Sequence, residues 1–201
     1  NTLKNMPAKN KIPLEIERKF ILKKLPLFDK KVELIDIVQF YVGENKQKVR
    51  YRRSLKPGGI KLSYFTPSGQ EVKYTTDAKG EKYYQTIKRA ISKGVWEENE
   101  KSIQAKQFVV DLSAHIKRKV LFKVRYVYKY KGLKFEVDVY RKLTLVTLEV
   151  ELDDIKQKIE FPDCIKREIL MEVTGRKEFS NYNLSEEHRG KINGSIFADS
   201  F

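Results

Sequence analysis

The sequence predicts a mainly β protein, an antiparallel sheet domain with a few helices packed against it. Apolar and polar residues alternate with a period of two along most of the chain, which is typical of strands whose two faces meet different surroundings. Turn signals such as KPGG at 56–59 and TPSGQ at 66–70 separate these runs. A length of 201 residues suits one domain with a sizeable core.

The alternating runs predict ten strands in chain order. They are expected at 14–22, 36–43, 46–53, 60–65, 82–90, 95–102, 118–130, 133–140, 145–152 and 168–174. Residues 54–81 are rich in Gly, Thr and Lys and predict an extended hairpin or loop excursion. Residues 1–12 are expected to form a basic N-terminal arm, and residues 13–201 a single domain.

Helical signals are fewer. A short helix is expected after Pro26, over 26–34, and another over 176–185. The region 103–117 is the best amphipathic segment, and we expect it to cover one face of the sheet. Its apolar stripe consists of Ile103, Phe108, Val109, Leu112 and Ile116.

Charge and cysteine content restrict the possible partners and compartment. The net charge of +15, from 42 Lys and Arg against 27 Asp and Glu, favours an anionic partner such as nucleic acid, an anionic membrane or polyphosphate. The single cysteine, Cys164, excludes an intramolecular disulfide and suits the reducing cytoplasm. No apolar run approaches the ~20 residues that span a bilayer, so no membrane partner is expected.

One face of many predicted strands is almost entirely ionised. Glu15, Glu17 and Lys19 share one face of the first strand, opposite Ile16, Arg18 and Phe20. Similar faces carry Arg50 with Arg52, Thr86 with Lys88, Glu98 with Glu100, Lys123 with Arg125, Lys134 with Glu136 and Asp138, and Glu149 with Glu151. An ordinary sheet with one face in water also produces such alternation. Same-sign pairs on strand after strand are unusual for a solvated face, because like charges two residues apart repel each other.

A metal–polyphosphate site would explain why these strand faces carry charged residues. Arg and Lys match phosphate oxygens, and Arg can bind them with two hydrogen bonds. Carboxylates beside a phosphate chain need a hard divalent cation between the two, and Mg²⁺ is commonly held by one or two carboxylates plus phosphate oxygens and water. If the strands close into a barrel, the charges line a channel and the outer apolar faces need cover, which 103–117 would provide.

The ordered set of motifs resembles the CYTH domain, or triphosphate tunnel metalloenzyme, family. EIERKF has the ExExK form that opens that family, and the match continues through VRYRR, QTIKR, EENE, KVRY, GLKFEVDVY, TLEVEL and the ending MEVTGRKEFSNYNL. These motifs cover about residues 14–184. The resemblance implies a closed eight-stranded antiparallel β-barrel, a tunnel that binds a triphosphate and hydrolyses it with Mg²⁺ or Mn²⁺.

The resemblance also implies roles for individual residues. The expected catalytic residues are Glu15, Glu17, Lys19, Arg50, Arg52 and Lys88. Expected substrate-binding residues are Lys19, Arg50, Arg52, Lys88, Lys123, Arg125 and Lys177. The expected metal ligands are Glu15, Glu17, Glu149, Glu151, Glu136, Asp138 and Glu172, while Glu98 and Glu100, like Glu136 and Asp138, would serve a second metal or orient basic residues.

Two features depart from the family pattern. Trp96 stands two residues before the EENE pair, where the family often has a basic residue, and the 54–81 excursion is longer than expected. Both concern the mouth of the tunnel and therefore the choice of substrate.

Three functions remain open from the sequence. The first is hydrolysis of inorganic tripolyphosphate. The second is action on an organic triphosphate, as an RNA 5′-triphosphatase, a nucleotide or thiamine triphosphatase, or an adenylate cyclase. The third is a noncatalytic module that binds polyphosphate or RNA.

Overall fold

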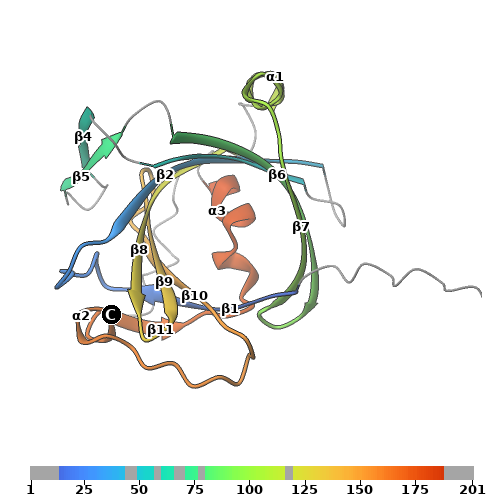
Figure 1. Ribbon diagram of the computed structural model, residues 1–201. Helices are drawn as coiled ribbons and strands as arrows, with labels where there is room; N and C mark the ends of the chain where they lie inside the picture. The colour runs from blue at the N-terminus through green and yellow to red at the C-terminus, as the bar shows by residue number, and fades with distance from the viewer. Residues whose placement is uncertain are drawn as a thin grey trace, which may run out of the picture.

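Eight antiparallel strands close into a barrel in the computed structural model, which describes residues 14–43, 49–56, 60–65, 71–76, 80–115 and 120–187 (Figure 1). Around the barrel the order is β10-β9-β8-β2-β3-β6-β7-β1, and pairing of β1 with β10 completes the ring. The strands are β1 (Leu14–Leu22), β2 (Glu33–Val42), β3 (Val49–Leu55), β6 (Glu81–Ser92), β7 (Val95–Ser102), β8 (Val120–Tyr130), β9 (Leu133–Tyr140) and β10 (Val146–Glu151). The mainly β fold and the closed eight-stranded barrel are therefore confirmed.

β1 is the strand whose pairing closes the ring. One of its edges pairs with β10, in a register that sets Glu17 opposite Glu151 and Lys19 opposite Glu149. Its other edge pairs first with β7, where Glu15 lies opposite Trp96. The short strand β11 (Ile169–Glu172) then continues that edge, outside the ring.

The apolar faces of the strands point outward. Phe20, Val137 and Leu148 belong to the largest core cluster, which lies between the outer face of the barrel and the chain segments that cover it. One cover is the segment after β10, which includes Phe161 and the helix α2 (Asp163–Lys166). Burial of this apolar surface is the main force that holds the outer layer on the barrel.

The second cover is the segment between β1 and β2, and here the sequence prediction is wrong. Residues 26–32 form no helix, and β2 already begins at Glu33. Phe28 instead reaches over the barrel and stacks on Tyr126 and Tyr128, with ring centroids 5.8 and 5.7 Å away. An irregular chain lets the apolar residues of this segment spread over a curved sheet.

The amphipathic helix is confirmed as α1 (Ala105–His115), which packs on the outside of the barrel (Figure 1). Phe108 is buried against Phe40 and Val38, with Leu112 and Ile103 packed beside them. Val109 is 58% exposed, so its place in the predicted stripe is wrong. Ile116 lies outside the described residues.

One end of the barrel interior is filled by the C-terminal elements. The 3₁₀ helix η2 (Lys177–Phe179) and the helix α3 (Asn181–Glu187) follow β11, which confirms the helix expected near 176–185. Phe179 and Leu184 are buried with Ile21, Leu121 and Tyr140, whose side chains point into the barrel. In Figure 1, α3 is seen through the ring of strands.

The 54–81 excursion contains a separate two-stranded sheet of β4 (Ile60–Phe65) and β5 (Glu71–Thr76), which confirms a hairpin-like excursion and adds a strand that the alternation did not predict. The expected basic arm at 1–12 lies outside the described residues. Among the helices of the described ranges, none has the length and apolar character needed to cross a membrane.

Candidate functional site

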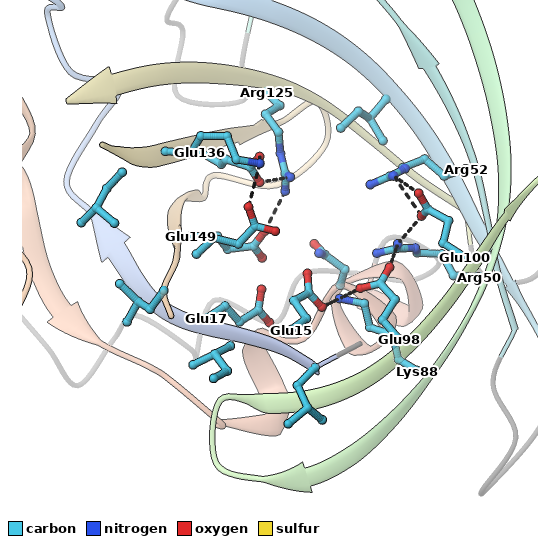
Figure 2. Close-up of a pocket in the computed structure, with 18 of the residues that line it drawn as sticks. Glu15, Glu17, Arg50, Arg52, Lys88, Glu98, Glu100, Arg125, Glu136 and Glu149 are labelled. Atoms are coloured by element: carbon cyan, nitrogen blue, oxygen red, sulfur yellow. Dashed lines mark hydrogen bonds and ion pairs between the residues drawn. The ribbon is translucent and has the colours of Figure 1, made fainter. Parts of the chain in front are cut away.

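The ionised strand faces point inward and line a cavity of about 710 Å³. Figure 2 shows two charged walls with open space between them: Arg125, Glu136 and Glu149 on one side, and Arg50, Arg52, Lys88, Glu98 and Glu100 on the other. The alternation therefore predicted the lining correctly, because the pleat of each strand sends every second side chain into the barrel.

The first wall is built by β3, β6 and β7. Arg50 Nη2 lies 3.0 Å from Glu98 Oε1 and 3.2 Å from Glu100 Oε2, and Arg52 Nη2 lies 3.0 Å from the same Glu100 oxygen. Thr86 donates a 2.8 Å hydrogen bond to Glu100 and accepts one of 3.1 Å from Arg50. The Nε atoms of Arg50 and Arg52 are buried and have no hydrogen-bond partner in the described part of the chain. Both arginines line the cavity, and the positive charge of their guanidinium groups suits an anion bound there.

The second wall is built by β8, β9 and β10 around Arg125. Its Nη2 atom lies 2.7 Å from Glu149 Oε2, and it also pairs with Glu136. Lys19 Nζ approaches the other Glu149 oxygen to 2.9 Å. Burial opposes ionisation of Glu149, but the cationic groups of Lys19, Lys123 and Arg125 prevail and hold its pKa well below the ordinary value.

Asp138 does not have the surroundings expected of a metal ligand. Arg125 Nε lies 2.8 Å from Oδ1, while Arg125 Nη2 lies 2.8 Å from Oδ2, which Lys123 also contacts. Asp138 is fully buried, and burial lowers the pKa of Lys123 to about 8. Because cationic partners surround both oxygens, the geometry favours the alternative role, in which Asp138 orients Arg125. Glu136, paired with Arg125 and Lys134, has similar partners.

Glu17 is the carboxylate that lies between the two walls, and Figure 2 shows it without a dashed contact. No hydrogen bond or ion pair of its carboxylate occurs within the described residues. Burial and the nearby Glu149 raise its pKa. On the same strand face, Glu15 contacts Lys88, and burial together with the hydrogen bond that protonated Glu15 donates to Glu98 raises the pKa of Glu15 to about 8. A cation beside this pair would relieve both the burial cost and the repulsion.

The donor set fits a hard divalent cation that shares its ligands with a phosphate. In the ranges that the structure describes, no three His, Cys, Asp or Glu side chains converge closely enough to hold a metal by themselves. Two carboxylates plus phosphate oxygens and water are the usual surroundings of Mg²⁺. Glu15 and Glu17 fit that pattern best, and Glu149 lies near them on β10, the strand that pairs with β1 to close the barrel.

Three residues expected in the site lie away from the centre of the charged cavity. Glu151 lines the mouth of the cavity, where its half-exposed side chain pairs with Lys134 at 2.7 Å. Glu172 lies opposite Phe20 on the outer face and forms a two-pronged pair with Arg18, so its predicted place among the tunnel carboxylates is not what the structure shows. Lys177 is exposed and lines a second, adjoining cavity.

Among the lining residues that sequence reasoning missed are Gln39, Asn181 and Asp153. Gln39 is 1% exposed and lies opposite Arg52 in the β2–β3 pairing. A Gln between the apolar residues Val38 and Phe40 was the available signal, since strands favour apolar residues at buried positions. Asn181 begins α3 and accepts a 2.9 Å hydrogen bond from Tyr140. Nothing in the alternation of the strands could place it.

A closed antiparallel barrel with an ionised interior defines the class of proteins with a triphosphate tunnel fold, and the resemblance to that family is confirmed at the level of the fold. The chain matches the crystal structure of the inorganic triphosphatase NE1496 with 26% identity and a TM-score of 0.52, over 85% of this chain and 93% of that one. A second crystal structure, of the hypothetical protein NE1496, matches with the same identity and TM-score over 85% of this chain and 97% of that one. No family model matches the chain, and neither does any curated protein.

Proposed function

We propose that the protein is a divalent-metal-dependent triphosphatase, which hydrolyses the terminal phosphoanhydride bond of inorganic tripolyphosphate or a related triphosphate inside the barrel. The neighbour that is described as an inorganic triphosphatase supports the hydrolase class and favours inorganic tripolyphosphate as the first candidate substrate. Mg²⁺ or Mn²⁺ is the proposed cofactor.

The balance of charge in the lining is the observation that carries the metal dependence. Eight carboxylates and six cationic side chains line the cavity in the described residues. The carboxylates are Glu15, Glu17, Glu98, Glu100, Glu136, Glu149, Glu151 and Asp153, and the cationic residues are Arg50, Arg52, Lys88, Lys123, Arg125 and Lys134. Counted as ionised groups the carboxylates outnumber the cations by two, and a cation that enters with the triphosphate would allow Glu15 and Glu17, whose pKa values are raised, to ionise beside the phosphates.

The chain's own residues would bind and polarise the phosphates from two sides. Arg50, Arg52 and Lys88 reach from one wall and Arg125 from the other, and their positive charges would stabilise the equatorial and leaving oxygens as the terminal phosphoryl group transfers to water. Binding of phosphate would replace part of the present pairing with Glu98, Glu100 and Glu149. A metal held by Glu15 and Glu17 would supply further neutralisation of the phosphate charge.

Organic triphosphates remain the second candidate, because the catalytic requirements of the phosphate chain are the same. A noncatalytic polyanion module is less consistent with the site, since carboxylates in the channel would only weaken its binding of anions. The comparisons give no support for RNA as a partner.

The test is phosphate release from tripolyphosphate, ATP and thiamine triphosphate with Mg²⁺, with Mn²⁺ and with EDTA. We expect metal-dependent release from tripolyphosphate that EDTA abolishes. Absence of release from every substrate with either metal would overturn the proposal, and binding of tripolyphosphate without turnover would then select the noncatalytic module. Cyclic AMP and pyrophosphate from ATP would identify a cyclase.

A further inference from the structure

β1 has a gap in its strand pairing at two of the candidate site residues. On one of its edges β7 pairs with residues 14–16 and β11 with residues 20–22, and among the described strands none pairs with residues 17–19 on that edge. The backbone amides of Glu17 and Lys19 face this gap, while their side chains point into the barrel, as Figure 2 shows for Glu17. The groups that fill the gap therefore determine how this part of β1 is held.

Single groups, instead of a strand, satisfy the backbone atoms at the gap. Gly94 O accepts a 2.9 Å hydrogen bond from Glu17 N, and Val173 N donates one of 2.8 Å to Lys19 O. Lys19 N donates a 3.0 Å hydrogen bond to the hydroxyl oxygen of Thr174, whose side chain is buried. Because a buried N–H group without an acceptor is costly, the hydroxyl of Thr174 replaces the carbonyl that a neighbouring strand would supply.

An ion pair on the outer face of the barrel orients this hydroxyl. Thr174 Oγ1 donates a 2.6 Å hydrogen bond to Glu172 Oε1, the same oxygen that accepts a 3.0 Å hydrogen bond from Arg18 Nε. A hydroxyl has one proton and two lone pairs, so donation to Glu172 leaves the lone pairs for Lys19 N. The Arg18 side chain is thus linked to the backbone of its neighbour Lys19 through Glu172 and Thr174.

We propose that Thr174 is a positioning residue, whose hydroxyl fixes the backbone of Lys19 and thereby directs the side chains of Glu17 and Lys19 into the barrel. The inference rests on the proposed function, because it explains how β1 presents these side chains to metal and phosphate. Groups that bind a metal or a reacting phosphate need to be held within ~0.5 Å of the productive geometry. Loss of the hydrogen bond at Lys19 N loosens β1 two residues from Glu17, where such a shift weakens metal binding.

The first test compares two buried threonines. Thr174→Val keeps the shape of the side chain without its hydroxyl, and we expect the Kd of Mn²⁺, measured by calorimetric titration without substrate, to rise about tenfold. Thr147→Val is the matched control, because Thr147 is also buried and its hydroxyl lies 3.2 Å from Tyr140 OH, on β10 opposite Ile21. It should lower the Tm to a similar extent and leave the Kd of Mn²⁺ unchanged. Equal Kd values for the two valine variants would overturn the inference.

The conservative variant Thr174→Ser distinguishes positioning by the hydroxyl from packing of the side chain. Serine keeps the oxygen and loses the methyl group, so the Kd of Mn²⁺ should stay within about twofold of the wild-type value. A Kd for Thr174→Ser as high as that for Thr174→Val would show that packing, and not the hydroxyl, is what matters.

Two variants of Glu172 test the orientation of the hydroxyl. Glu172→Gln retains an oxygen that accepts from Thr174, whereas Glu172→Met removes it. We expect Glu172→Met to raise the Kd of Mn²⁺ several-fold and Glu172→Gln to raise it by about twofold at most. A wild-type Kd in Glu172→Met would contradict the role of the outer ion pair.

Hydrogen exchange of the Lys19 amide provides a measurement that requires neither metal nor turnover. Exchange should be faster in Thr174→Val than in Thr147→Val, and equal rates would count against the inference. If the wild-type protein binds Mn²⁺ but hydrolyses no triphosphate, the proposed function fails, while the Mn²⁺ affinities and exchange rates still decide the role of Thr174. If the wild-type protein is an active triphosphatase and the two valine variants behave alike, only the inference about Thr174 is wrong.

Discussion

Lys19 and Glu149 meet at the seam that closes the barrel, 130 positions apart in the chain, where Lys19 Nζ lies 2.9 Å from Glu149 Oε1. Both side chains are almost fully buried. The pair thus links β1 to β10, where the ring closes, and Glu149 also contacts Arg125 in the charged wall. The same residues therefore stabilise the fold and belong to the candidate site.

Loss of the seam pair should be costly to stability. Lys19→Met leaves a buried carboxylate without one of its partners, and we expect the free energy of unfolding to fall by about 3 kcal/mol in urea denaturation. Lys134→Met is the matched control, because its 2.7 Å pair with Glu151 is half exposed and should contribute less than about 1 kcal/mol. Equal losses for the two variants would contradict a structural role for the seam pair.

Glu17→Gln should separate stability from activity. The change removes a buried charge without a partner and should leave the free energy of unfolding unchanged or higher, while metal-dependent turnover falls by about 100-fold or more. Turnover and thermal denaturation of the same preparation check both parts. Glu151→Gln, at the mouth, should reduce turnover far less, and near wild-type turnover of Glu17→Gln would refute the metal assignment.

The raised pKa of Glu15 predicts how stability depends on pH. Because its pKa is about 8 in the folded protein and 4.5 in the unfolded chain, the folded state holds more protons between these values. Stability in EDTA should therefore fall as pH rises from 4.5 to 8. A saturating divalent cation should flatten this slope, and Glu15→Gln should do so without metal. The Tm measured across that range is the test, and a rise in stability with pH in EDTA would contradict the assignment.

Asp138→Asn should distinguish a residue that orients Arg125 from a metal ligand. We expect the Kd of tripolyphosphate to rise about tenfold, and the Kd of Mn²⁺ to stay unchanged in calorimetric titration. Since Asp138 also pairs with buried Lys123, Glu136→Gln is the second variant in case the first does not fold. A Kd of Mn²⁺ that rises in both variants would restore these residues as ligands.

Gly94 positions Glu17 through the backbone. It has a φ of +75°, its carbonyl accepts a 2.9 Å hydrogen bond from Glu17 N, and an added Cβ would lie 2.6 Å from Glu17 O. Gly94→Ala should lower both the Tm and the turnover. Gly132→Ala is the control, because Gly132 has a φ of +79° with no atom within 4 Å of an added Cβ, so only the conformational cost of about 1 kcal/mol applies. Equal turnover of the two variants would show that the close approach to Glu17 is unimportant.

The period-two alternation predicted which faces line the cavity, because the pleat alone decides that, and Glu15, Arg50, Lys88 and Arg125 all point inward as expected. It did not predict which charges pair. Asp138 has the inward parity of a ligand, and only the register of β8 with β9 shows that it faces Arg125. β8 and β9 form a hairpin, and the turn at Lys131 and Gly132 sets its register, which the alternation of each strand by itself does not specify.

Glu172 and the 26–34 segment show the same limit. Glu172 belongs to a four-residue strand, too short for its alternation to reveal which face is outward, and pairing with Phe20 places it outside the barrel. Pro26 gave an acceptable start signal for a helix, yet packing of Phe28 over Tyr126 outweighed local preference. Tertiary contacts decided both cases.

The seam also has a consequence for how the protein is made. β1 leaves the ribosome long before β10 and β11, and more than a hundred residues must be synthesised before its two edges are covered. β7 can pair with the first residues of β1 earlier, but until β10 and β11 emerge the part of β1 that bears Phe20 and Ile21 has no strand beside it, which slows folding and exposes the nascent chain to aggregation. The pairing of β1 with late strands, which completes the wall of the barrel, thus delays folding of the barrel. During its synthesis this protein should therefore depend more on chaperones than a helical protein of equal length.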